Sequence, residues 1–135
     1  MPKLYRSREG EVTDVDTKTQ LTTLGSETAP GPLLVPNRAK KLAGILVAAV
    51  GNHSAPNDAN FFIRLEGPGL KEGPEVIAAG AEGTQIATGG AAGKRAEFIP
   101  LDIPIEPSQE ILLFGEMGGG DIGAAQFGVT LIFEV

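Results

Sequence analysis

The residues that could do chemistry are concentrated in the polar stretch 51–60, which contains the only histidine of the chain. His53 stands beside Ser54, and Asp58 follows a few positions later. A nucleophilic serine would need these three side chains to converge in space, and zinc would need three or four nitrogen, sulfur or oxygen ligands. One histidine and one aspartate are too few for zinc, and the spacing gives no sign of a triad. We therefore predict a polar surface loop with no metal ligand and no catalytic residue.

Two glycine-rich stretches could cradle a phosphate or a cation. The first ends in Gly93-Lys94-Arg95, but a phosphate loop would need a glycine where Thr88 stands, a hydroxyl residue after the lysine, and then a helix. The second, residues 118–121, provides Asp121 as a single carboxylate, whereas calcium takes six to eight oxygen ligands. The chain has no cysteine, which excludes disulfides and thiolate chemistry. We therefore expect no enzyme and no cofactor.

Composition narrows the class of protein further. A chain of 135 residues fits one domain, and a net charge of −6 argues against nucleic-acid binding by the folded body. No apolar run approaches the ~20 residues that a membrane-spanning helix needs. The first ten residues are polar and do not resemble a signal peptide. With 19 glycines and 10 prolines, short strands joined by turns are favoured over long helices.

The elements that would position any site are most visible in residues 96–135. Large apolar residues fall at alternate positions in three successive segments, which predicts strands with one buried face and one exposed face. The residues expected to face the core are Ile99, Leu101, Ile103, Ile105, Ile111, Leu113, Phe127, Val129, Leu131 and Phe133.

Turn signals between apolar segments extend this reading to an all-β domain. The predicted strands are 33–35, 42–50, 61–66, 75–79, 84–88, 97–105, 109–116 and 125–134. We predict an antiparallel two-sheet β-sandwich of jelly-roll type over residues 32–135. The polar residues 1–31 run into an Ala-Pro-Gly-Pro break at 29–32 and are predicted to form an extended N-terminal arm, with a loosely ordered leader as the alternative.

Several predicted strands are apolar on both faces. In 42–50, Leu42 and Leu46 alternate with Ile45 and Val47, so a monomer would expose one of the two sets. A closed homo-oligomer, with a trimer favoured, would cover that set, and the arm could cap a strand edge of a neighbour. The predicted interface residues are Leu21, Leu24, Leu42, Leu46, Leu112, Phe114 and Ile132.

A resemblance to a known class of proteins rests on the polar arm and two motifs. These are I-P-L-D-I-P-I-E-P at 99–107 and F-G-V-T-L-I-F-E-V at 127–135. In this style the chain resembles small viral structural proteins, namely single jelly-roll capsid, decoration or cement subunits. The resemblance implies a non-enzymatic, self-assembling subunit located in the virion, which contacts neighbouring capsid or shell proteins through its arm and sandwich edges.

The alternative function is a carbohydrate-binding or other ligand-binding β-sandwich module. Sugar sites commonly use aromatic platforms, and this chain has no tryptophan and one tyrosine, Tyr5, within the predicted arm. Outside a virion, the absence of a signal peptide predicts a soluble protein.

Overall fold

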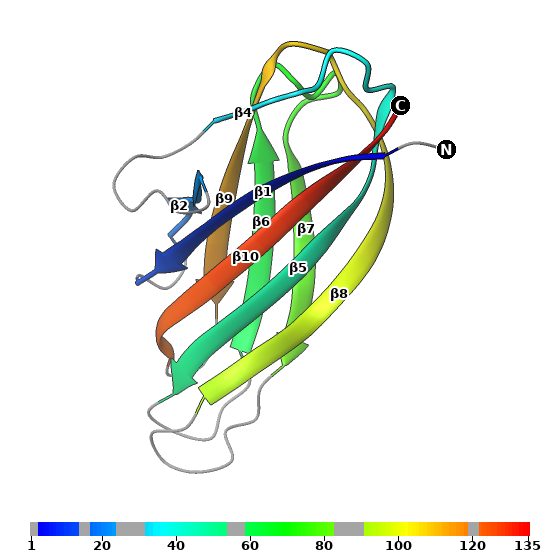
Figure 1. The fold of residues 1–135 in the computed structure, drawn as a ribbon. Coiled ribbons are helices and arrows are strands. Elements are labelled where there is room, and N and C mark those ends of the chain that lie inside the picture. Colours follow the sequence, from blue (N-terminus) through cyan, green and yellow to red (C-terminus); the bar gives the residue numbers. More distant parts are fainter. Residues whose placement is uncertain (1–2, 14–16, 24–31, 54–58, 83–90, 119–121) are drawn as a thin grey trace.

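A computed structural model describes residues 3–13, 17–23, 32–53, 59–82, 91–118 and 122–135 (Figure 1). Within these residues every regular element is a β-strand. The strands are β1 (Lys3–Val12), β2 (Thr19–Gln20), β3 (Thr22–Thr23), β4 (Leu33–Leu34), β5 (Lys41–His53), β6 (Ala59–Glu66), β7 (Glu75–Glu82), β8 (Ala91–Pro104), β9 (Glu110–Gly118) and β10 (Ile122–Glu134).

The strands form two antiparallel layers. Sheet 1 has the order β3-β1-β10-β5-β8, and sheet 2 has the order β2-β9-β6-β7, with β4 also paired to β9. Figure 1 shows sheet 1 lying across sheet 2. The main pairs join strands from the two halves of the chain in reverse order. β1 pairs with β10, β2 and β4 pair with β9, β5 pairs with β8, and β6 pairs with β7. A long hairpin folded over into two layers produces this order, which is that of a jelly roll. The predicted fold class is confirmed.

The core lies between the two sheets and follows the predicted alternation. Ile103, Ile105, Ile111, Leu113, Phe127, Val129, Leu131 and Phe133 are buried, and Ile99 and Leu101 pack against them. The rings of Phe61 and Phe127 meet edge to face across the layers, with centroids 5.6 Å apart. A Cβ at Gly115 would lie 3.1 Å from the Phe127 ring, so glycine there lets the ring rest against sheet 2.

Strand boundaries differ from the prediction at the polar stretch 51–60. Residues 51–53 continue β5, where His53 pairs with Ile122 of β10, and residues 59–60 begin β6. Pairing with neighbouring strands therefore extends β5 into residues whose composition is typical of a loop. Residues 54–58 and the predicted strand 84–88 lie outside the described residues.

The N-terminal residues require a larger correction. All of β1 pairs with β10, from Lys3 opposite Glu134 to Val12 opposite Ala125, and both Val12 and Leu21 are fully buried. Residues 3–12 and 19–23 therefore belong to the sandwich, and the boundary predicted at residue 32 is wrong for them. The strand pattern of β1 is hidden because its inward positions include Arg6 and Arg8. Residues 24–31 lie outside the described part of the chain.

Leu42 is also placed differently from the prediction. It is fully buried together with Ile45 and Val47, whereas Leu46 is 41% exposed. The pairing with β10 runs from Phe133 opposite Leu42 directly to Ile132 opposite Gly44. Ala43 is thus an extra residue on β5, and this β-bulge shifts Leu42 to the face occupied by the odd-numbered residues. Strict alternation could not reveal the shift.

The bulge gives a direct test on one strand. We expect Leu42→Ala to lower the free energy of unfolding by about 2–5 kcal/mol, because it leaves a cavity in the core. Leu46→Ala, four residues away, should lower it by less than about 1 kcal/mol, because that side chain is partly in solvent. Urea denaturation at low protein concentration measures both values. Equal losses would contradict the bulge.

Candidate interaction surface

The outer face of sheet 1 carries an apolar strip made of Tyr5, Leu46, Phe98 and Ile132. Tyr5 pairs with Ile132, which pairs with Gly44, and Leu46 pairs with Phe98 one row further along. Tyr5 is 57% exposed, Phe98 47% and Leu46 41%. Three large exposed apolar side chains from three strands therefore lie within two neighbouring rows of one sheet face.

A glycine shapes this strip. A Cβ built on Gly44 would lie 2.4 Å from Cε1 and 2.6 Å from Cζ of Phe98. Because Phe98 pairs with Leu46, its ring must reach diagonally to the next row to lie over Gly44. The absence of a side chain at residue 44 thus lets the aromatic ring lie along the sheet, which makes the strip flatter.

Charged residues of both signs border the strip along β1. Lys3 lies at one end, and Glu9 and Glu11 lie at the other. Next to Lys3 in the sheet, the Lys41 Nζ is 3.4 Å from the Asp102 Oδ1 and 3.9 Å from the Glu134 Oε2. The Lys3 end of this face therefore carries charges of both signs, and Glu9 and Glu11 lie toward the other end.

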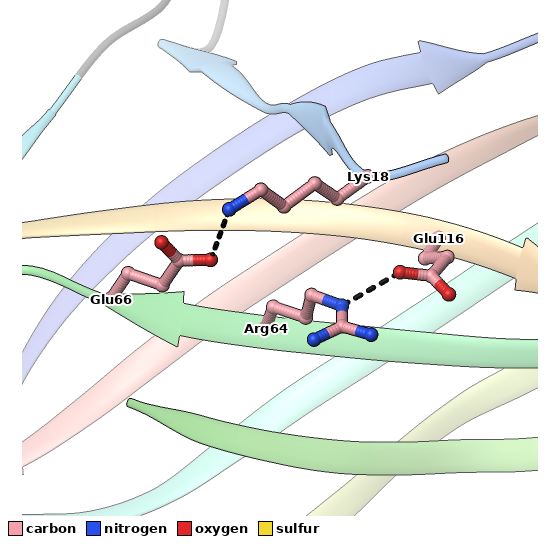
Figure 2. A network of polar contacts seen from close by, with 4 residues as sticks. All are labelled: Lys18, Arg64, Glu66 and Glu116. Atoms are coloured by element: carbon pink, nitrogen blue, oxygen red, sulfur yellow. Dashed lines mark hydrogen bonds and ion pairs between the residues drawn. The ribbon is translucent and has the colours of Figure 1, made fainter. Parts of the chain in front are cut away.

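The outer face of sheet 2 is covered by ion pairs within the chain (Figure 2). The Lys18 Nζ lies 2.6 Å from the Glu66 Oε2 and 4.6 Å from the centroid of the Phe114 ring. The Arg64 Nε donates to the Glu116 Oε1 at 2.6 Å, and this hydrogen bond is the main cause that raises the pKa of Arg64. Lys18 thus shields an aromatic ring that would otherwise face solvent.

The seven predicted interface residues fall into four groups. Leu46 and Ile132 lie in the apolar strip, while Leu112 and Phe114 lie half-buried on the outer face of sheet 2. Leu21 and Leu42 lie in the core and present no outer surface. Leu24 lies outside the described residues.

Two residues of the apolar strip, Phe98 and Tyr5, were not among the interface residues predicted from the sequence. Phe98 is out of phase with Ile99, Leu101 and Ile103, and that displacement is the signal that could have identified it as an outward aromatic residue. Tyr5 gave no such signal, because its strand was interpreted as an arm.

No group of three or more histidine, cysteine, aspartate or glutamate side chains within the described ranges could hold a metal ion. In the same part of the chain, no helix is long and apolar enough to cross a membrane.

Comparison with known proteins adds little. No protein-family profile and no curated protein matches this chain. Among solved structures, it is similar to a T13 particle of infectious bursal disease virus (IBDV), with a TM-score of 0.34, 14% identity and coverage of 95% of this chain and 31% of that one. For a T=1 particle derived from the virus, the TM-score is 0.34 and the identity 16%, with coverage of 95% of this chain and 32% of that one. For T=1 particles of its mutant VP2 protein, the TM-score is 0.28 and the identity 13%, with coverage of 98% of this chain and 36% of that one.

The chain thus spans about a third of the length of these solved chains. TM-scores of 0.28 to 0.34 are too low to assign a fold or a function to this chain. The jelly-roll assignment rests on the strand order of the chain itself.

The close packing at Gly44 gives a second prediction. Gly44→Ala should lower the free energy of unfolding by about 1–3 kcal/mol, because the new Cβ would also lie 2.9 Å from the backbone oxygen of Ile99. Gly128→Ala is the matched control in the same sheet, since a Cβ there meets no atom within 4 Å. It should be neutral or stabilising by about 0.5 kcal/mol. Thermal or urea unfolding of both variants would decide, and equal effects would contradict the packing at Gly44.

Proposed function

We propose that this protein is a structural, non-enzymatic subunit that assembles with copies of itself, as a capsid or decoration subunit of a virion. The observation that carries the proposal is the apolar strip on sheet 1. Large exposed apolar side chains that gather on one face are typical of interaction sites, and aromatic residues are enriched in protein interfaces.

The size of the face suits a contact between proteins. Four strands spaced by about 4.8 Å, each contributing about ten residues at about 3.3 Å, give a face of roughly 600 Å². A stable interface buries about 800 Å² per partner, so this face would supply most of one. Leu46 lies on the inner strand β5, and Tyr5 and Phe98 lie on the flanking strands β1 and β8, so the three side chains together span the width of the face.

The charges around the strip favour a second copy as the partner. Because Lys3 lies at one end of β1 and Glu11 at the other, a neighbouring copy that sets its Lys3 end against the Glu11 end of this one would bring unlike charges together. Self-complementarity of this kind suits a homo-oligomer. On the outer face of sheet 2, Lys18 lies over the Phe114 ring and also pairs with Glu66, so that ring is less available to a partner.

The virion assignment is the finer part of the proposal. It is supported by the jelly-roll strand order and by the resemblance of the segments 99–107 and 127–135 to small capsid and decoration subunits. Neighbouring shell proteins would then be further partners, and a trimer is the favoured assembly. The net charge of −6 does not suit binding of nucleic acid by the folded body.

Light scattering on a sizing column tests the assembly. The intact protein should elute with about three times the 14.0 kDa of one chain. Leu46→Glu and Phe98→Glu should each shift the mass toward the monomer, because a carboxylate in the strip would have to be desolvated on assembly. Val76→Glu is the control, since Val76 is 54% exposed on β7 of sheet 2, away from the strip.

Circular dichroism of each variant confirms that the fold is retained. A monomeric intact protein at every concentration would overturn the proposal and favour the alternative, a ligand-binding sandwich. Variants of the strip that assemble as well as the Val76→Glu control would also contradict it.

A further inference from the structure

A polar cavity of about 510 Å³ lies between β1 and the segments around residues 32–37 and 108. Its volume is that of a small-molecule site. Its lining has four apolar residues, Pro32, Leu34, Val35 and Pro36, and four polar ones, Arg6, Arg8, Asn37 and Ser108. None of the described residues that line the cavity is acidic.

The two arginines are held on the same face of β1, two residues apart. Arg8 donates from one terminal nitrogen to the Ser7 carbonyl oxygen at 2.7 Å and from the other to the Pro32 carbonyl oxygen at 3.2 Å. Arg6 donates to the Tyr5 carbonyl oxygen at 2.9 Å. These bonds tie both guanidinium groups to backbone oxygens and so limit how far they can move apart.

Arg8 is the more buried of the two arginines, and Arg6 is exposed. Their partners across the sheet, Leu131 and Val129, are buried core residues. Burial lowers the pKa of Arg8, and the positive charge of Arg6 lowers it further. An anion bound beside both arginines would reduce the repulsion between their two positive charges.

The opposite wall is formed by a constrained turn. Ser108 adopts φ +67°, a left-handed conformation that costs a residue other than glycine on the order of 1 kcal/mol. Its backbone NH donates to the Val35 carbonyl oxygen at 2.9 Å, and its hydroxyl donates to the Asn37 Oδ1. Because the Oδ1 accepts this bond, the Asn37 Nδ2 is kept as a donor for a ligand.

We propose that this cavity binds a phosphate-type oxyanion, with Arg6 and Arg8 as charged donors and Asn37 as a neutral donor. Two guanidinium groups match the charge of a phosphate dianion, and donors on two walls suit a tetrahedral group. A carboxylate needs only one guanidinium for a bidentate pair, so it would use the cavity less fully. The site is separate from the apolar strip and does not depend on assembly.

Titration calorimetry and thermal unfolding with inorganic phosphate test the proposal on the full chain. Phosphate should raise the melting temperature more than acetate or chloride does at matched ionic strength. Arg6→Gln should weaken phosphate binding by roughly tenfold, because a hydrogen bond between charged groups is lost. Arg8→Gln should do the same, and Arg6 offers the safer variant because its side chain is exposed. Lys71→Gln is the control, since Lys71 is exposed and does not line the cavity.

An equal shift with acetate and phosphate would overturn the assignment to a phosphate-type anion. Phosphate affinity that survives Arg6→Gln and Arg8→Gln unchanged would overturn the site itself.

A second variant separates binding from folding. Ser108→Gly relieves the left-handed conformation and also removes the hydroxyl that fixes Asn37, so it should keep or raise the melting temperature and still weaken phosphate binding several-fold. Unchanged phosphate affinity in this variant would overturn the role of the Ser108–Asn37 wall. The two measurements are expected to move in opposite directions, which a purely structural role of Ser108 would not produce.

Discussion

The pairing of β1 with β10 is the constraint on which the rest of the structure depends. It joins the first described strand to the last over ten residue pairs, and through β10 it connects β1 to β5 and β8. The Ser7 and Thr130 hydroxyl groups, 123 positions apart in the sequence, lie 2.7 Å from each other. This pairing brings Tyr5 next to Ile132 in the apolar strip and also directs Arg6 and Arg8 toward the cavity. Both proposed sites therefore depend on the same strand.

The two sheets differ in how they treat their outer faces. On sheet 2, lysine and arginine side chains pair with carboxylates from neighbouring segments, and the stem and charge of Lys18 cover an aromatic ring. On sheet 1, two neighbouring rows hold Tyr5 and Ile132 in one and Leu46 and Phe98, with Ser7 and Thr130, in the other. Exposed ion pairs contribute little to stability, so the difference matters mainly for contact with other molecules. Three of the large exposed apolar side chains, Tyr5, Leu46 and Phe98, thus gather on sheet 1, whereas Leu34 and Val76 lie apart on β4 and β7 of the other layer.

The sequence was most informative where one face of a strand is uniformly apolar. The alternation in β8, β9 and β10 correctly predicted the core and, with the turn signals, the jelly-roll class, because burial of one face requires a period of two. It failed at Leu42, where one inserted residue reverses the faces of β5, and a bulge leaves no mark in the hydrophobic pattern. It failed also at β1, whose inward positions include two arginines. The cavity could not be foreseen, because it brings together residues from β1, the segment 32–37 and position 108. The strand order that joins them is not encoded locally.

The position of β10 between β1 and β5 also determines when sheet 1 can form during synthesis of the chain. As a chain leaves the ribosome, β1 and β5 emerge long before residues 122–134, which lie between them in the sheet. Until then β1 lacks its main partner and β5 has only one of its two neighbours, β8, and a fold dominated by such distant pairings forms slowly. The apolar strip needs side chains from β1, β5, β8 and β10 in register, so a nascent chain does not yet present it. The topology therefore completes the apolar strip only after residues 122–134 have been synthesised.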